Sequence, residues 1–221
     1  MDLALRLRSG FGLGLCALSA ALTISAGESA TNLQGAMAAR LTAARELRSQ
    51  QQQQTYVVTP ERKALLNTIR YAEGTWKQGE QGYRTLYGGS TFNSYDKHPE
   101  RVIVKRYTSA AAGAYQFLPR TWAMAARKLD LLDFGPRNQD QAALFLIERR
   151  DALDEADSGE LTPQLLAKLA PEWASLPTLK ARSYYGQPVK KAVDLQEFYE
   201  DNLEVLRRQA AQNGPIPLRF S

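Results

Sequence analysis

The sequence predicts an α+β protein that is mainly helical, with a small β-sheet or hairpin. Apolar residues recur at helical spacing in several separate segments, most of which begin with a helix-start signal. Between the first two of these segments, residues 74–116 are rich in glycine and tyrosine and contain one run typical of a β-strand. Many helices around one small sheet make a helix-dominated α+β domain.

The first predicted helix covers residues 60–73. Thr59 can cap its start, Pro60 suits the first helical position, Glu61 lies in the first turn and Gly74 can end the helix. Its apolar face is expected to enter the core, and consists of Leu65, Leu66, Ile69 and Ala72.

Glu73 occupies an unusual position for an acid, because it continues this apolar face at i+4 from Ile69 and i+7 from Leu66. Partial burial and the negative end of the helix dipole both disfavour a charged carboxylate, so we expect the pKa of Glu73 to be raised. A carboxylic acid that stays protonated near neutral pH is what cleavage of a glycosidic bond requires. The alternative is a helix-end Glu that extends into solvent.

Residues 74–116 combine glycines with aromatic side chains, a pattern typical of a loop-rich wall around a sugar. Glycines let the backbone turn tightly, and aromatic faces with polar tips stack on sugar rings. Gly88-Gly89 predicts a turn and residues 101–107 are the best strand candidate, so we expect a small hairpin or sheet. Alternatively, the aromatic side chains fill a small core of their own. They are Trp76, Tyr83, Tyr87, Tyr95, Tyr107 and Tyr115.

Helices return after residue 118. One is expected to begin near Pro119, a second near Asn138 and a third at Thr162-Pro163, and the last spans roughly residues 189–208. The residues in register on one face of each helix are Trp122, Ala125, Ala126 and Leu129, then Ala142, Phe145, Leu146 and Arg149, then Leu165, Leu166 and Leu169, and finally Leu195, Phe198, Tyr199, Asn202 and Leu206. Trp122 and Trp173 are both expected in the core, because their neighbours follow helical apolar patterns.

Residues 1–26 have the pattern of a secretory signal peptide. Arg6 and Arg8 precede the apolar stretch 11–26, which ends in small residues and is too short for a comfortable membrane span. We therefore expect an exported protein, in the periplasm or outside the cell; the alternative is an uncleaved membrane anchor. Residues 27–55 are rich in Ala, Gln, Ser and Thr, which predicts a low-complexity linker or a loosely formed helix.

Composition fits one catalytic domain over residues 56–210, followed by a C-terminal tail over residues 211–221. Of the 221 residues, 44% are hydrophobic and 23% charged, enough to bury one core. The net charge of +5 suits an anionic polymer, but the basic residues are dispersed among acids, so nucleic acid is a poor candidate. Cys16 and His98 are the only residues of their types, so we expect no disulfide, metal or cofactor. We expect a monomer.

A series of short motifs extends from residue 62 to residue 206. They are Arg62-Lys63-Ala64-Leu65-Leu66, Ala72-Glu73-Gly74-Thr75, Gly82-Tyr83, Tyr87-Gly88-Gly89 with Phe92, His98-Pro99, Ala112-Gly113-Ala114-Tyr115-Gln116, Asp133-Phe134, Gln139-Asp140, Ile147-Glu148-Arg149, Trp173-Ala174-Ser175-Leu176-Pro177 and Tyr185-Gly186-Gln187. This ordered set resembles the phage lambda endolysin family of the lysozyme-like superfamily. Each motif alone is weak, but the order makes the set specific.

The resemblance implies a lysozyme-like fold, a peptidoglycan substrate and lytic transglycosylase chemistry. It implies that Glu73 is the catalytic acid and that the substrate groove is lined by Tyr115, Gln116, Tyr185 and Gln187. The chain departs from the family at Arg84, where the family has an acid, so the resemblance does not extend to the outer sugar subsites.

Two of the groove residues have alternative interpretations. The Gln116 amide could hydrogen-bond the acetamido or hydroxyl groups of a sugar, or it could be a buried structural group. Tyr185 could stack on a sugar or fill the junction between the last two helices, and the neighbouring Tyr184 could take either role instead.

The acids of the chain favour a mechanism with a single carboxyl group. A glycoside hydrolase normally needs two carboxylates, but none of the candidate partners of Glu73 repeats its position on an apolar helix face. These candidates are Glu80, Asp96, Glu100 and Asp154. We therefore expect a lytic transglycosylase that cleaves between N-acetylmuramic acid and N-acetylglucosamine, with Glu73 as acid and base. The alternatives are a hydrolytic muramidase with a second carboxylate and a noncatalytic peptidoglycan-binding module.

Overall fold

The computed structural model describes residues 34–43 and 56–212. Contacts divide the chain into two units, Met1–Gln53 and Gln54–Ser221. In the first unit the described part is one helix, whose side chains are all exposed. The expected signal peptide, residues 1–26, lies outside the described residues. No helix in the described part of the chain is both long and apolar enough to cross a membrane.

The second unit is built around helix α2 (Pro60–Ala72), which is buried on most of its sides. The side chain of Thr59 caps its start, as predicted, by accepting a hydrogen bond from the backbone N–H of Arg62 at 3.2 Å. The helix ends at Glu73, and Gly74 follows with a φ of +77°, a conformation that favours glycine. The predicted apolar face of α2 is buried, which confirms its inward orientation.

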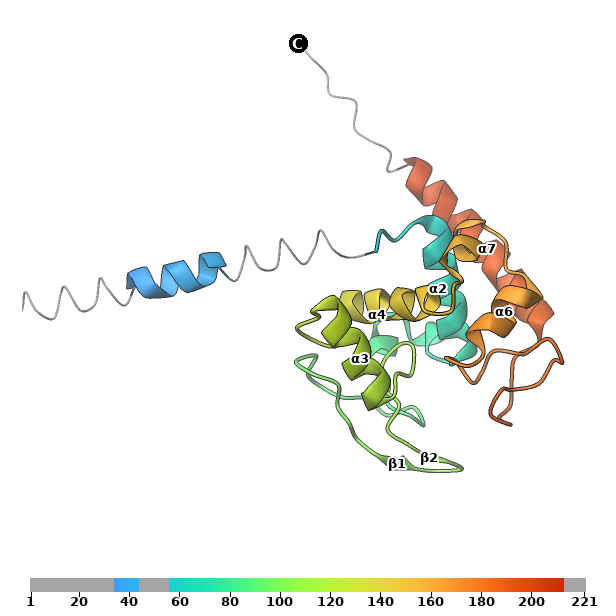
Figure 1. The fold of residues 1–221 in the computed structure, drawn as a ribbon, viewed down its shortest axis with the longest axis horizontal. Coiled ribbons are helices and arrows are strands. Elements are labelled where there is room, and N and C mark those ends of the chain that lie inside the picture. The colour runs from blue at the N-terminus through green and yellow to red at the C-terminus, as the bar shows by residue number, and fades with distance from the viewer. Residues whose placement is uncertain (1–33, 44–55, 213–221) are drawn as a thin grey trace, which may run out of the picture. The chain divides into compact units, whose positions relative to one another are not determined.

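Helix α7 (Ala192–Gln212) lies along α2, as Figure 1 shows. The rings of Tyr71 and Phe198 stack with centroids 4.3 Å apart, and the Asn67 side chain donates a 2.7 Å hydrogen bond to Asn202. These contacts join the C-terminal helix to the helix that carries the predicted catalytic acid.

The segment after α2 contains structure that the sequence did not predict. A 3₁₀ helix, η1 (Trp76–Arg84), follows the acid and bends at Gly79, where φ is +56° and ψ is −128°. The predicted turn at Gly88-Gly89 is confirmed, since both glycines have positive φ, of 83° and 96°.

The predicted hairpin is present, but its strands are shorter than expected. Strands β1 (Ile103–Val104) and β2 (Thr108–Ser109) pair antiparallel. The prediction of a strand over residues 101–107 was therefore wrong in extent. The physical reason is that Val102 and Val104 are 61% and 75% exposed, so no other layer covers their side of the hairpin, and within residues 34–43 and 56–212 no third strand extends it.

The remaining helices confirm the mainly helical α+β class. They are α3 (Pro119–Leu129), α4 (Pro136–Glu148), α5 (Leu153–Asp157) and α6 (Pro163–Leu169). Helices α4 and α5 pack against α2, and α3 packs against α4. The short helix α5 was not predicted, and α4 begins two residues before the expected Asn138. Trp122 and Trp173 are buried, as predicted, although Trp173 follows α6 rather than lying in a helix.

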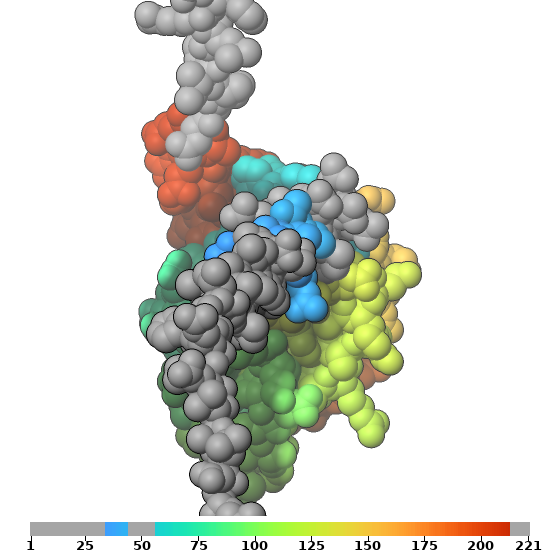
Figure 2. All heavy atoms as spheres, turned by 90° about the vertical axis from the view of Figure 1, so that its left-hand side faces the viewer, coloured from blue at the N-terminus to red at the C-terminus, as the bar shows by residue number. Residues whose placement is uncertain are grey.

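The last helix extends into the segment that was expected to be a C-terminal tail. The prediction placed its end near residue 208, whereas α7 continues to Gln212. Residues 207–212 are exposed, and Figure 2 shows this end of α7 projecting from the body of the domain. The C-terminal end of α7 therefore extends beyond the surface against which the rest of the helix packs.

Candidate functional site

A cleft of about 700 Å³ opens beside the C-terminal end of α2. Its walls come from the β1–β2 hairpin, residues 115–118, the start of α3, the end of α4 and the loop 171–187. All of the residues predicted from the sequence to form the site line this cleft: Glu73, Tyr115, Gln116, Tyr185 and Gln187. Tertiary packing thus brings together segments from both ends of the domain.

Glu73 is held at the cleft by the turn that ends α2. Its backbone N–H donates to the carbonyl of Ile69 at 2.9 Å, which makes it the last hydrogen-bonded residue of the helix. Two residues later, the buried Thr75 donates its hydroxyl to the carbonyl of Ala114 at 2.6 Å. This bond fastens the turn to the cleft wall and so fixes the position of the acid.

The carboxyl group of Glu73 is poorly solvated and has one hydrogen-bonding side chain beside it. Burial raises the pKa of Glu73 from 4.5 to about 7, and hydrogen bonds from the hydroxyl and backbone of Ser175 oppose this rise. The Ser175 hydroxyl donates to Oε1 at 2.7 Å. Near neutral pH both states of Glu73 are therefore populated: the protonated acid, which can give a proton, and the carboxylate, which can take one. The raised pKa expected from the sequence is present.

Tyr115 borders the cleft but directs its side chain into the core. It is 1% exposed, and its hydroxyl donates to Oδ1 of Asp140 at 2.6 Å. Its carbonyl oxygen accepts a 3.2 Å hydrogen bond from the indole N–H of Trp173. The structure thus makes the Tyr115 ring a core group, and any contact of this residue with substrate is left to its backbone.

Gln116 has a left-handed backbone conformation, with a φ of +48°. A residue other than glycine in this region signals a local constraint, and such residues cluster at functional sites. The amide nitrogen donates to the carbonyl oxygens of Gly113 at 2.9 Å and Thr85 at 3.2 Å. Both interpretations therefore apply, because the nitrogen supports the cleft wall while the amide oxygen is available to accept from a ligand.

Tyr185 rather than Tyr184 lines the Glu73 cleft. Tyr185 is 58% exposed and donates its hydroxyl to the carbonyl of Pro171 at 2.8 Å, which holds the ring in place. Tyr184 lines a separate hollow within residues 178–189, and Gln187 lines both. The structure thus decides which of the two adjacent tyrosines a bound sugar can reach.

Two further aromatic residues reach the cleft from the glycine-rich segment. Tyr87 follows η1 and Tyr107 lies in the hairpin, where its backbone N–H donates to the Tyr87 hydroxyl at 3.3 Å. Arg84, which replaces an acid of the family pattern, does not line the cleft. Its guanidinium lies 4.0 Å from the centre of the Tyr95 ring and donates to the carbonyl of Phe92, so it stabilises the neighbouring loop.

The second carboxylate of the cleft is one that the sequence did not indicate. Glu172 lines the cleft and forms a 2.8 Å ion pair with Arg150. None of the four acids proposed from the sequence as partners of Glu73 lines it. Glu172 directly precedes the Trp173–Pro177 motif, which also contains Ser175 and was one of the ordered motifs, although the sequence did not assign it to the groove.

His98 is a structural residue. It is 2% exposed, its Nε2 lies 2.9 Å from the carbonyl oxygen of Phe117, and its Nδ1 accepts from the backbone N–H of Glu100 at 3.1 Å. These partners require a neutral ring with the proton on Nε2, and burial lowers the pKa of His98. No cluster of metal-ligating side chains is found within residues 34–43 and 56–212.

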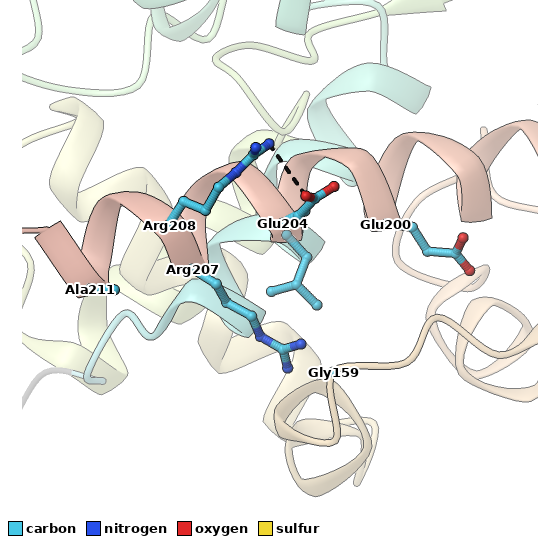
Figure 3. Close-up of a pocket in the computed structure, with 7 residues that line it drawn as sticks. Gly159, Glu200, Glu204, Arg207, Arg208 and Ala211 are labelled. Atoms are coloured by element: carbon cyan, nitrogen blue, oxygen red, sulfur yellow. Dashed lines mark ion pairs between the residues drawn. The ribbon is translucent and has the colours of Figure 1, made fainter.

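A third hollow, of about 480 Å³, lies along α7 and carries no predicted site residue. Figure 3 shows Glu200, Glu204, Arg207 and Arg208 on the helix, with Gly159 in the turn beside them. Its charged groups pair locally, because Arg208 lies 3.5 Å from Glu204 and Arg207 lies 3.0 Å from Glu61. The Glu73 cleft is therefore the candidate site.

Comparisons with known proteins match the catalytic unit. A model of the endolysin family matches residues 63–206. The endolysin of Escherichia phage lambda is 35% identical over 144 residues, which cover 62% of this chain and 88% of the phage protein. The endolysin of Escherichia phage P2 is 32% identical over 129 residues, covering 52% of this chain and 78% of that protein.

A solved structure matches as well. Bacteriophage lambda lysozyme complexed with a chitohexasaccharide superposes with a TM-score of 0.61 at 32% identity, covering 66% of this chain and 96% of that one. These similarities confirm the lysozyme-like fold and the resemblance carried by the ordered motifs. The roles of the individual cleft residues stay predictions.

Proposed function

This chain belongs to the endolysin family, and we propose that it is a lytic transglycosylase that cleaves peptidoglycan strands between N-acetylmuramic acid and N-acetylglucosamine. The observation that carries the proposal is the state of Glu73, a carboxyl group in the cleft whose pKa is raised by burial to about 7. Further support comes from the relative solved with a bound chitohexasaccharide, since it has the same fold.

Proton transfer in this mechanism depends on Glu73 alone. Glu73 gives its proton to the oxygen that bridges the two sugars, and the bond from that oxygen to C1 of the muramic residue breaks. The carbonyl oxygen of the neighbouring N-acetyl group stabilises the positive charge left on C1. Glu73, now a carboxylate, removes the proton of the same sugar's primary hydroxyl, whose oxygen bonds to C1. The products are a free N-acetylglucosamine hydroxyl and an anhydro-muramic end, and no water is consumed.

Ser175 is a positioning residue in this scheme. Its hydroxyl binds Oε1 of Glu73 at 2.7 Å, so the carboxyl group cannot rotate freely between the bridging oxygen and the primary hydroxyl. The same bond limits the rise in the pKa of Glu73. The acid therefore stays able to release its proton in the first step.

Hydrolysis is the second candidate, because Glu172 places another carboxylate in the cleft. Its surroundings argue against a role as the base that activates water. Nε and Nη2 of Arg150 both lie 2.8 Å from Oε1 of Glu172, and the Glu172 side chain is 10% exposed. A carboxylate oxygen bound by two nitrogens of one guanidinium is fixed in place and is not free to turn toward a water.

Mass spectrometry of digested sacculi tests the proposal. The wild-type protein should release fragments with anhydro-muramic ends, each lighter by one water than the corresponding reducing end. Glu172→Gln should give the same product type at a rate within roughly tenfold of wild type, because it is not asked to transfer a proton. Reducing ends that disappear with Glu172→Gln would establish the hydrolase, and intact sacculi after wild-type treatment would favour a binding module.

We also propose that residues 1–26 direct export to the periplasm or the cell exterior. Support comes from Arg6 and Arg8 ahead of the apolar stretch 11–26. Cell fractionation and N-terminal sequencing of the full chain should find a shortened protein outside the cytoplasm, and deletion of residues 1–26 should retain it inside. A full-length protein in the membrane fraction would support the uncleaved anchor instead.

A further inference from the structure

The cleft carries positive charge where α3 and α4 meet it. Arg120 lies in the first turn of α3, Arg149 and Arg150 lie at the end of α4, and all three line the cleft. The carboxyl groups that line it are Glu73, whose pKa is raised to about 7, and Glu172. The lining therefore holds three guanidinium groups and two carboxyl groups.

Among the described residues, one of these arginines has a carboxylate partner. Arg150 is paired with Glu172 at 2.8 Å. Arg120 and Arg149 are exposed and form no ion pair within residues 34–43 and 56–212. The guanidinium of Arg149 lies 6.0 Å from the centre of the Phe145 ring, a residue that is 7% exposed, so a buried ring supports it at the cleft.

The chemistry of the arginine side chain indicates what these two groups can bind. A guanidinium presents a rigid fork of N–H donors that matches a carboxylate, and such charge-assisted pairs are stronger than hydrogen bonds to neutral hydroxyl or acetamido groups. A muramic glycan without stems offers neutral groups and one lactyl carboxylate on each muramic residue, held close to the sugar ring. In peptidoglycan, the muramic residues carry peptide stems that end in free carboxylates, beside the bond that is cleaved.

We infer that Arg120 and Arg149 form a subsite for the carboxylates of the peptide stem, so that the cleft prefers stem-bearing strands to bare glycan. The inference rests on the proposed function, since it assumes a peptidoglycan strand in the Glu73 cleft. Arg150 does not share this role, because Glu172 already neutralises it.

The test compares kcat/KM on two substrates: soluble glycan strands free of teichoic acid, and the same strands after an amidase has removed the stems and left only the lactyl carboxylate of each muramic residue. The wild-type protein should prefer stem-bearing strands, and added salt should weaken that preference.

The double variant Arg120→Gln, Arg149→Gln should lose roughly 5- to 30-fold in kcat/KM on stem-bearing strands, the equivalent of one or two kcal/mol. The ratio of the kcat/KM values for the two substrates should then approach one. Arg127→Gln is the matched control, because Arg127 is an exposed arginine of α3 that does not line the cleft.

Equal losses of the double variant on both substrates, or a wild-type protein without preference, would overturn the subsite. Binding separates this failure from failure of the proposed function. If the wild-type protein cleaves neither substrate, the proposed chemistry is wrong, and retention of the strands by Glu73→Gln then decides the subsite. Glu73→Gln should retain stem-bearing strands more tightly than bare strands, and adding both arginine replacements should remove that difference. Equal retention of the two strands by Glu73→Gln would overturn the subsite.

Discussion

Two shielded carboxyl groups of this domain, Asp140 in the core and Glu73 at the cleft, have different surroundings. Asp140 is surrounded by donors: Lys63 Nζ and the Tyr83 hydroxyl at 2.7 Å, and the Tyr115 hydroxyl at 2.6 Å. Burial, and after it the charge of Asp140, raises the pKa of Tyr83 and of Tyr115, so both tyrosines keep the protons that they donate. This cluster of hydrogen bonds joins α2, η1 and α4.

Glu73 has fewer partners than Asp140, and its donors are the hydroxyl and the backbone of the single residue Ser175. Ser175 supplies its side-chain hydrogen bond, and the remaining surroundings mainly desolvate the carboxyl group. A buried carboxylate whose oxygens are fully hydrogen-bonded stabilises the fold, whereas one with few donors has a raised pKa and can exchange a proton near neutral pH. The number of donors, rather than burial alone, therefore distinguishes Asp140, which supports the core, from Glu73, which is suited to proton transfer.

The largest effect should come from removing the proton of Glu73. Glu73→Gln keeps the size of the side chain and an oxygen for Ser175, so fold and wall binding should persist while the cleavage rate falls roughly 10²–10⁴-fold. Release of soluble fragments from sacculi measures this loss. Glu100→Gln is the control, because Glu100 does not line the cleft, and its rate should match the wild type. A Glu73→Gln rate above about a tenth of wild type would contradict the assignment.

Asp140 should instead affect stability. Asp140→Asn leaves the largely shielded ammonium group of Lys63 without its carboxylate partner, so the free energy of unfolding should fall by about 2–5 kcal/mol. Urea unfolding measures the change. The control is Asp157→Asn, which breaks the Arg62 ion pair at a site where the aspartate side chain is 38% exposed, against 12% for Asp140. The loss there should be below about 1 kcal/mol, and equal losses in both variants would remove the distinction between the two environments.

The raised pKa of Glu73 should make the active acid a source of instability at high pH. Its pKa is about 7 when folded and 4.5 ordinarily, so its stabilising contribution is present below pH 4.5 and is lost as pH rises to 7. Glu73→Gln has no such charge and should gain about 1–3 kcal/mol relative to wild type between pH 4 and pH 8. Urea unfolding at both pH values measures this gain. A pH-independent difference between the two proteins would show that the carboxyl group is well solvated.

The smallest effect is expected from Ser175. Its hydrogen bonds lower the pKa of Glu73, so Ser175→Ala should raise that pKa further and move the alkaline limb of the pH–rate profile upward. A hydrogen bond of about 0.5–1.5 kcal/mol corresponds to about 0.4–1 pH unit. Ser158→Ala, in the turn after α5, should leave the profile in place. A shift of the Ser175→Ala profile to lower pH would contradict the proposed contact.

Local sequence signals were sufficient for several elements. The start of α2 at Thr59-Pro60, the start of α6 at Thr162-Pro163 and the turn at Gly88-Gly89 each depend on residues within one or two turns of the chain. The helical period also placed Glu73 on the buried side of α2. Such predictions succeed because capping, glycine conformation and helical period act over short distances along the chain.

Other features depend on contacts between distant segments, and local patterns could not predict them. The residues 101–107 have strand-like composition, but the hairpin found no layer to cover it, so its strands are two residues each. Tyr184 and Tyr185 are alike in sequence, and only the path of the loop decides that Tyr185 meets the cleft. The tyrosine of the Tyr115-Gln116 pair enters the core because Asp140 and Trp173 hold it there.

The sequence by itself determined the helical architecture and, through the position of Glu73 on an apolar helix face, the group most suited to glycosidic chemistry. The tertiary structure decided which side chains surround that acid: Ser175 as its hydrogen-bond donor, Glu172 as the second carboxylate and Arg150 as the partner that neutralises it. The physical reason is the distance along the chain over which each property is determined. A helix face is set by neighbours within a few residues, whereas the pKa of a carboxyl group depends on burial and donors supplied by segments that meet only when the core has packed.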